Sequence, residues 1–293
     1  MTRVLYPSLR LSANGAAALL DTVERGYHLY DLPAGKLRWD LSEEGDLAHL
    51  TLSASGDAVA WVTRDGQLMT ITGAGKTSTS LPVAAEQIVA IAISDDGQRT
   101  PILLSSGKLL LDGAGVDLPN LDRGAILANG DCTLIAVHSA NTVTGEDALN
   151  AFVSRGDALH PLGQDAAATA ETGAIAVYGD WLVAATADGL RGWPLLGKAI
   201  TLPGTLRDRM IFSPDGRHLL AYRAEEIVHV TGARMRFRVF DLASEKEVRA
   251  ADHQIDDRQG AQFVLDAALN IYEVRALRTG DLAIHQLASQ SAE

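Results

Sequence analysis

The chain has 293 residues, a formal charge of −12, 47% apolar residues, 5% aromatic residues and one cysteine. A chain of this length buries enough apolar surface to fold without disulfides or a structural metal, and a single cysteine excludes an internal disulfide. The excess of acidic residues excludes a general nucleic-acid-binding protein, because non-specific affinity for nucleic acids comes from lysine and arginine side chains that neutralise phosphates.

The start of the chain does not resemble a secretory signal. Such a signal has a basic region and then an apolar run of about 7 to 15 residues, whereas the apolar run 16–20 follows Asn14-Gly15 and ends at Asp21. No segment approaches the roughly 18 uninterrupted apolar residues of a membrane span. We therefore expect a cytoplasmic protein that does not bind membranes. Lysine is rare and alanine abundant, which is typical of the GC-rich genomes of many bacteria.

A short turn motif recurs along the chain. In most copies an apolar strand ends in a small polar residue, a glycine follows within a few positions, and a second apolar strand begins. Gly15, Gly56 and Gly97 mark the first three copies at intervals of 41 residues, and seven such units would average about 42 residues each. The copies lie at 12–15, 53–56, 94–97, 128–131, 178–180 and 213–216, with a degenerate copy at 266–270.

Each unit is predicted to contain four short strands. They are clearest in 47–81, where the segments are short, rich in β-branched and aromatic residues, and separated by glycine turns such as Asp65-Gly66. The Ala-rich segment 165–172 is the only stretch with the composition of a helix. The four strands predicted within 47–81 are 49–53, 58–64, 67–72 and 76–81.

These features predict an all-β fold: a seven-bladed β-propeller of four-stranded antiparallel blades, formed by residues 1–293 as a single domain. The last unit supplies only three strands, at 261–265, 270–276 and 281–287. Either Thr2–Tyr6 adds the fourth strand and closes the propeller, which removes an open sheet edge, or 3–12 is one long inner strand and the last blade has three strands.

Two units resemble a known family. The segment 212–221 (Phe-Ser-Pro-Asp-Gly-Arg-His-Leu-Leu-Ala), followed by 239–244, looks like a tryptophan-aspartate (WD) repeat of the bacterial kind. In that family the third strand closes on an aromatic-Asp pair, which here is Phe240-Asp241 and Tyr30-Asp31, while the usual Gly-His dipeptides are missing. Related bacterial propellers include lactonases and dehydrogenases, so the resemblance implies the fold rather than an activity.

The longer predicted connections share one face of the propeller. Connections between strands two and three, or between units, include 138–151, 224–233 and 249–260, whereas connections on the opposite face are a few residues long. Loops on a rigid scaffold often carry binding sites. We therefore predict a partner-binding surface here, with drift in tolerant loops as the alternative. Its candidate residues are Glu146, Asp147, Glu225, Glu226, His253, Asp256 and Asp257.

One segment is basic against the acidic background. Residues 206–238 contain seven arginines and four acidic residues, which leaves a charge of −15 on the rest of the chain. Arg234, Arg236 and Arg238 alternate with apolar residues, so a strand places all three on one face, where they could bind an acidic partner or a phosphate. The alternative, which we favour, is an outer strand whose arginines cover apolar surface and pair with Glu225, Glu226 or Glu245.

The sequence offers little chemistry. Cys132 and His138 are placed on one strand about 20 Å apart, too far for a thiolate-imidazole pair, so Cys132 is predicted to be a packing residue. No two histidines have the spacing of metal ligands. The cluster 252–257 could ligate a divalent cation, but its spacing matches no calcium loop. Trp39, Trp61, Trp181 and Trp193 are predicted to pack between blades.

These observations favour a non-catalytic scaffold that binds one or more proteins as a subunit or adaptor of a larger assembly, without a cofactor or a metal. The alternative is a propeller enzyme, a hydrolase or lactonase that uses carboxylates and a metal in the central channel. A carbohydrate-binding protein is a third hypothesis. It would need an aromatic pocket, for which 5% aromatic residues leave little material.

Overall fold

The structure is a computed structural model, and it describes residues 7–22, 26–44, 47–81, 83–112, 114–118, 123–140, 147–155, 158–162, 173–227, 232–256, 260–277 and 279–287. In these residues the chain forms seven antiparallel sheets of consecutive strands and one short 3-10 helix, η1 (Ala85–Gln87). The fold is therefore all-β and a seven-bladed β-propeller, as predicted, and each sheet is one blade. None of the described helices is long and apolar enough to cross a membrane.

The chain divides into two compact units, and residues 46–206 form one of them. This unit holds four four-stranded blades. Blade 2 contains β5 (Ala48–Leu52), β6 (Ala58–Val62), β7 (Gln67–Thr72) and β8 (Gly75–Ser80), and blade 3 contains β9 (Ile88–Ile91), β10 (Ile102–Leu104), β11 (Lys108–Leu111) and β12 (Ala114–Asp117). Blade 4 contains β13 (Arg123–Ala128), β14 (Leu134–Ala140), β15 (Asp147–Arg155) and β16 (Ala158–Pro161), and blade 5 contains β17 (Ile175–Tyr178), β18 (Trp181–Thr186), β19 (Gly189–Pro194) and β20 (Ile200–Leu202).

Residues 1–45 and 207–293 form the other unit. Blade 1 contains β1 (Ser8–Leu11), β2 (Ala17–Asp21), β3 (Tyr27–Asp31) and β4 (Lys36–Asp40). Blade 6 contains β21 (Arg209–Phe212), β22 (His218–Ile227), β23 (Ala233–Asp241) and β24 (Lys246–Ile255). Blade 7 contains β25 (Gln262–Leu265), β26 (Ile271–Ala276) and β27 (Leu282–Gln286), three strands among the described residues. The alternative fourth strand, Thr2–Tyr6, and the Ala-rich segment 165–172 lie outside the described residues.

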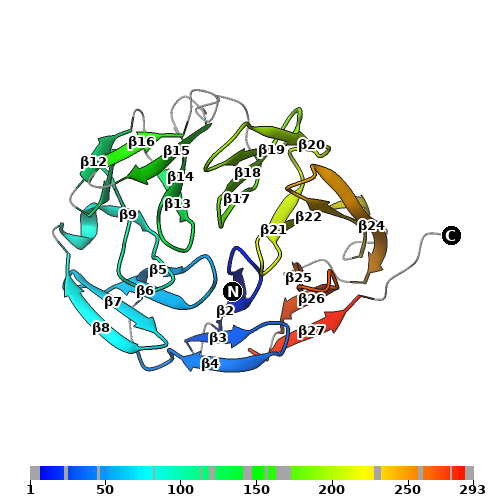
Figure 1. Ribbon diagram of the computed structural model, residues 1–293. Coiled ribbons are helices and arrows are strands. Elements are labelled where there is room, and N and C mark those ends of the chain that lie inside the picture. The colour runs from blue at the N-terminus through cyan, green and yellow to red at the C-terminus, as the bar shows by residue number, and fades with distance from the viewer. Residues whose placement is uncertain are drawn as a thin grey trace. The chain divides into compact units, whose positions relative to one another are not determined.

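Within this unit the two ends of the chain pack together. The Gln262 side chain donates a hydrogen bond of 2.6 Å to the Leu9 carbonyl oxygen, and β1 contacts β26. The Phe212 N–H donates to the Ala13 carbonyl oxygen at 3.0 Å. Figure 1 shows the blue strands of blade 1 beside the red strands of blade 7. Blades far apart in the sequence therefore share one core.

The recurring turn has a common hydrogen-bond pattern. In blade 1 the Ser12 Oγ accepts the Ala17 N–H at 2.9 Å, while the Ser12 N–H donates to the Ala17 carbonyl at 3.0 Å. Ser53, Ser94 and Ser213 accept the equivalent N–H in blades 2, 3 and 6 at 3.0, 2.9 and 3.0 Å. These serines are buried because their hydroxyl groups complete the turn.

In the fourth and seventh copies of the turn, the residue with positive φ is not a glycine. The position with positive φ is Cys132 (φ 56°) in blade 4 and Leu269 (φ 63°) in blade 7, where Gly15 has φ 66° in blade 1. Asn129 and Asp266 replace the serine and accept the N–H of Leu134 at 2.9 Å and of Asn270 at 2.8 Å. The predicted turn glycine of blade 4, Gly130, therefore lies two positions before the residue with positive φ, Cys132. The Asn129 side chain accepts a backbone N–H and so preserves the turn without a glycine at that position.

The cores lie between neighbouring blades. In blade 2 all five residues of β6 are buried, and in blade 4 Cys132 is fully buried in an apolar cluster, which confirms its packing role. Cys132 lies in the turn before β14, so the prediction that it shares a strand with His138 is wrong. Trp61 and Trp193 are buried, whereas Trp39 and Trp181 are half-buried.

Candidate partner-binding pocket

Blade 6 has unusually long strands. β22 and β24 have 10 residues each and β23 has 9, whereas the inner strand β21 has 4. The predicted loops 224–233 and 249–260 are therefore wrong in large part, because 224–227, 233 and 249–255 belong to these strands. The predicted loop 138–151 is wrong in the same way, because 138–140 and 147–151 belong to β14 and β15. The mistake has a physical cause: Glu225 and Glu226 are exposed polar residues, so this part of β22 lacks the alternation of a half-buried strand.

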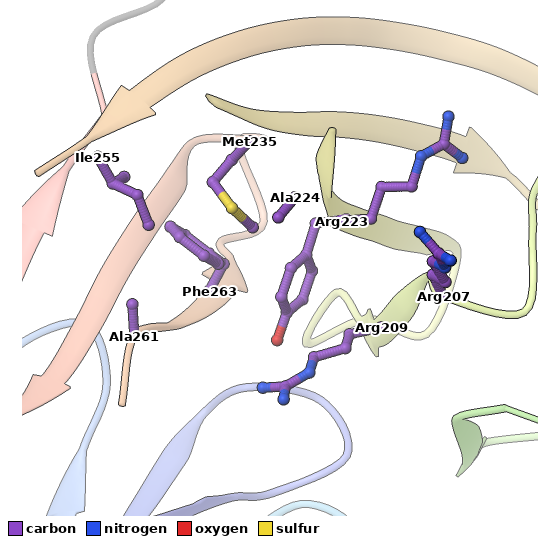
Figure 2. Close-up of a pocket in the computed structure, with 9 residues that line it drawn as sticks. Arg207, Arg209, Arg223, Ala224, Met235, Ile255, Ala261 and Phe263 are labelled. Atoms are coloured by element: carbon purple, nitrogen blue, oxygen red, sulfur yellow. The ribbon is translucent and has the colours of Figure 1, made fainter. Parts of the chain in front are cut away.

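A pocket of about 280 Å³ lies between blades 6 and 7, beside the long strands of blade 6. Met235 and Ile255 come from β23 and β24, and Phe263 comes from β25 of the next blade. Arg209 comes from β21, and Arg223 comes from β22. Figure 2 shows the apolar side chains on one side of the pocket and the three arginines, Arg207, Arg209 and Arg223, on the other.

Aromatic rings pack against one another inside the apolar wall. Phe263 makes edge contacts with Tyr222 and Phe237, with ring centroids 5.1 and 4.8 Å apart. Phe263 is 1% exposed and Met235 is 7% exposed. Such tilted ring pairs add stabilisation beyond the burial of their area. The wall is therefore closely packed and apolar.

The cationic rim differs between its arginines. Arg223 is neutralised, since its guanidinium lies 2.9 Å from Glu225 and 3.4 Å from the buried Asp208. Arg209 is exposed and donates a hydrogen bond to the hydroxyl of Tyr222, which also accepts the backbone N–H of Phe263. Burial raises the pKa of the Tyr222 hydroxyl above its ordinary value, so this group stays neutral beside Arg209. No carboxylate pairs with Arg209 among the described residues, and its charge remains uncompensated.

The three alternating arginines of β23 have a different role. Arg234 lies 2.6 Å from Asp252, Arg236 lies 3.3 Å from Glu225, and Arg238 lies 2.7 Å from Glu247. Arg238 also stacks over the Phe240 ring, 4.9 Å from its centroid. β23 is the third of four strands, so the prediction of an outer strand is wrong, because β24 adds a further long strand outside it. Pairing with acidic residues was predicted, but of the predicted acidic partners only Glu225 is an ion-pair partner here.

The other predicted site residues are spread over the chain. His253 is half-buried in β24, and Asp256 is exposed just after it. Asp147 begins β15 in the other unit, and Glu146 and Asp257 lie outside the described residues. The Asp252 carboxylate of the acidic cluster is paired with Arg234. Among the residues that the structure describes, no three His, Cys, Asp or Glu side chains gather as metal ligands.

The pocket residues Arg209, Tyr222 and Phe263 were not predicted individually. They come from three strands of two blades, so their proximity depends on packing that the sequence pattern does not show. The signal that could have found them is the basic segment 206–238, which contains two of the three. The alternating pattern instead drew attention to the arginines of β23, which are already paired.

Comparison with known proteins identifies the fold. No protein-family model and no curated protein sequence matches the chain. The WD40 domain of SCAP from fission yeast matches over 98% of this chain and 88% of its own, with a TM-score of 0.52 and 12% identity. A eukaryotic initiation factor matches over 96% of this chain and 78% of its own (TM-score 0.55, 10% identity). Kluyveromyces lactis Hsv2 matches over 83% of this chain and 74% of its own (TM-score 0.58, 10% identity). At these identities the likeness shows a WD40-type propeller fold alone.

Proposed function

We propose that this protein is a non-catalytic protein-interaction scaffold that binds an acidic segment of a partner protein at the arginine pocket between blades 6 and 7. The observation that carries the proposal is the combination of an apolar wall, Met235 and Phe263, with the uncompensated charge of Arg209. The propeller fold, which the chain shares with the WD40 domain of SCAP, supports the role of a scaffold.

The pocket geometry suggests how such a segment would bind. A volume of about 280 Å³ holds one or two side chains rather than a folded element. An apolar side chain of the partner would fill the space beside Met235 and Ile255, while a neighbouring carboxylate would pair with Arg209. The rest of the chain is acidic, so it repels an acidic partner everywhere except near the basic segment. The local charge therefore selects where the partner binds.

The proposed scaffold catalyses no reaction, and it acts in the cytoplasm. Thiol catalysis is disfavoured, since burial raises the pKa of Cys132 to about 12, with only a partial opposing effect from Arg99. A thiol with such a pKa stays protonated at neutral pH and is a poor nucleophile. Cell fractionation tests the compartment directly, and recovery of the protein with membranes would contradict that part of the proposal.

The test compares two charge reversals on the same sheet. Arg209→Glu reverses the charge in the pocket, whereas Lys246→Glu reverses an exposed charge at the start of β24, about 30 Å from its other end. Proteins captured from native lysate by the wild type should be lost with Arg209→Glu and kept with Lys246→Glu. For a purified captured partner, Arg209→Glu should weaken binding at least about 30-fold. Equal capture by all three proteins would exclude the pocket as the binding site.

A further inference from the structure

A second concave surface lies in the unit formed by residues 46–206, between blades 2 and 3, and the proposed function does not involve it. It is a groove of about 700 Å³, within the size range of ligand-binding clefts. β7 and β8 of blade 2 supply Leu68, Thr70, Thr77 and Thr79, and β11 of blade 3 supplies Leu110.

The groove has a structural cause in blade 3. β10 is only three residues long, and its ladder with β11 contains only two pairs, Ile102 with Leu110 and Leu103 with Leu109. Pro101 precedes β10 and has no N–H to donate, so the ladder stops there. The neighbouring blade 2 has full ladders of five and six pairs. The short blade 3 therefore leaves part of the face of β7 and β8 uncovered.

The edge of blade 2 beside this groove is open. β8 is the last strand of its sheet, and all six of its residues are exposed. After Lys76 it reads Thr-Ser-Thr-Ser, without charge and without proline. Natural edge strands are usually protected by charges or proline, as in β4, which carries Lys36, Arg38 and Asp40. Beyond Lys76, β8 has neither kind of protection, so its 77–80 segment can accept another strand.

The groove is electrically neutral and offers unused hydroxyl groups. Asp112 is the one charged residue among the described lining residues, and it is already paired with Arg99 at 2.7 Å. Thr70 is 4% exposed and lines the groove, and within the described part of the chain its hydroxyl makes no side-chain hydrogen bond. The described lining residues include no aromatic ring, which disfavours a sugar as the ligand.

We infer that the β8 edge and this groove bind an extended, uncharged segment of a partner protein, which adds to blade 2 as a fifth strand. Main-chain hydrogen bonds to β8 would supply affinity, and alternate side chains of the added strand would enter the groove beside Leu68 and Leu110. These side chains would be small and apolar or hydroxylated, because the groove walls are leucine and threonine. A charged side chain would find no partner there.

The register of β8 identifies the main-chain groups that bind the segment. The Leu81 N–H donates to the Gly66 carbonyl oxygen, toward β7. Because N–H groups alternate in direction along an antiparallel strand, the N–H groups of Thr77 and Thr79 also point toward β7, and those of Ser78 and Ser80 point outward. Ser78→Pro therefore removes an outward donor without removing a bond of the β7–β8 ladder. Ser78→Ala is its matched control.

The test is a displayed library of random peptides about eight residues long, enough to span the ~20 Å of β8. The wild type and Ser78→Ala should select uncharged sequences rich in Thr, Ser and Val, and Ser78→Pro should not. A selected peptide should bind Ser78→Pro about tenfold more weakly than Ser78→Ala. Thr79→Lys, which places a charge in the groove, should weaken binding of the selected peptide by a similar factor. On binding, hydrogen exchange should slow at the amides of Ser78 and Ser80.

Several outcomes would overturn the inference. They are selected peptides that carry net charge, peptides that bind Ser78→Pro as well as Ser78→Ala, or unchanged hydrogen exchange at Ser78. Concentration-dependent dimers that Ser78→Pro abolishes would show that a second copy of this chain occupies the edge instead. If Ser78→Pro fails to fold, Thr79→Lys and the exchange measurement still decide the question. Arg209→Glu should leave peptide selection unchanged, so this test is independent of the arginine pocket.

Discussion

Replacing Ser12 by alanine tests whether the buried serine of the recurring turn stabilises the fold. Ser12 is 2% exposed, its hydroxyl accepts the Ala17 N–H at 2.9 Å, and it donates to Asn14 at 2.8 Å. Ala17 is completely buried, so water cannot replace the lost acceptor. A buried N–H without a partner costs about 1–3 kcal/mol, and we expect Ser12→Ala to lower the free energy of unfolding by about 2 kcal/mol.

The matched control is Ser8→Ala in the same blade. Ser8 is exposed at the start of β1, and such surface changes usually alter stability by less than about 0.5 kcal/mol. Urea unfolding followed by far-ultraviolet circular dichroism measures both variants against the wild type. If Ser12→Ala and Ser8→Ala unfold within about 0.5 kcal/mol of each other, the turn hydrogen bond does not stabilise the fold as we argue.

Three further predictions concern strained or buried positions. Gly97→Ala places a Cβ 2.7 and 2.8 Å from threonine methyl groups of β7, so it should cost at least about 2 kcal/mol in thermal unfolding, whereas Gly66→Ala, with the same sign of φ and open space, should cost about 1 kcal/mol. Glu245 has φ 57° in an exposed turn, so Glu245→Gly should raise the free energy of unfolding by up to about 1 kcal/mol, and Ala243→Gly in the same turn should lower it. Because burial raises the pKa of Cys132 to about 12, the thiol should resist maleimide at pH about 8 and react once urea unfolds the chain; rapid labelling of the folded protein would contradict its burial.

Local signals were enough to predict most of the blades. Turn residues and short apolar runs depend on neighbours in sequence, so the four strands of blade 2 were predicted within two residues of their observed ends. The long strands of blade 6 were mistaken for loops, because polar residues stand on consecutive positions near the ends of β22 and β24: Glu225 and Glu226 in β22, and 252–254 in β24. In β22 this polarity reflects solvent on both faces of the strand rather than an irregular backbone.

The candidate site was predicted only as a region. The charge of the basic segment and the predicted face both pointed to the end of blade 6 where the pocket lies. The particular residues could not be predicted, because an arginine binds a partner only if no acidic side chain of its own protein is near. Arg236 has Glu225 at 3.3 Å, whereas Arg209 meets the neutral Tyr222, and the sequence does not show this difference.

We propose that the partner binds at the pocket end of blade 6. Hydrogen exchange of the protein, measured with and without a captured partner, tests it most directly. We expect slower exchange at the pocket ends of β22 and β23, around Tyr222 and Met235, and no change in the turn 243–245 at the opposite end of the blade. Protection of that turn, with unchanged exchange around the pocket, would show that the partner binds elsewhere.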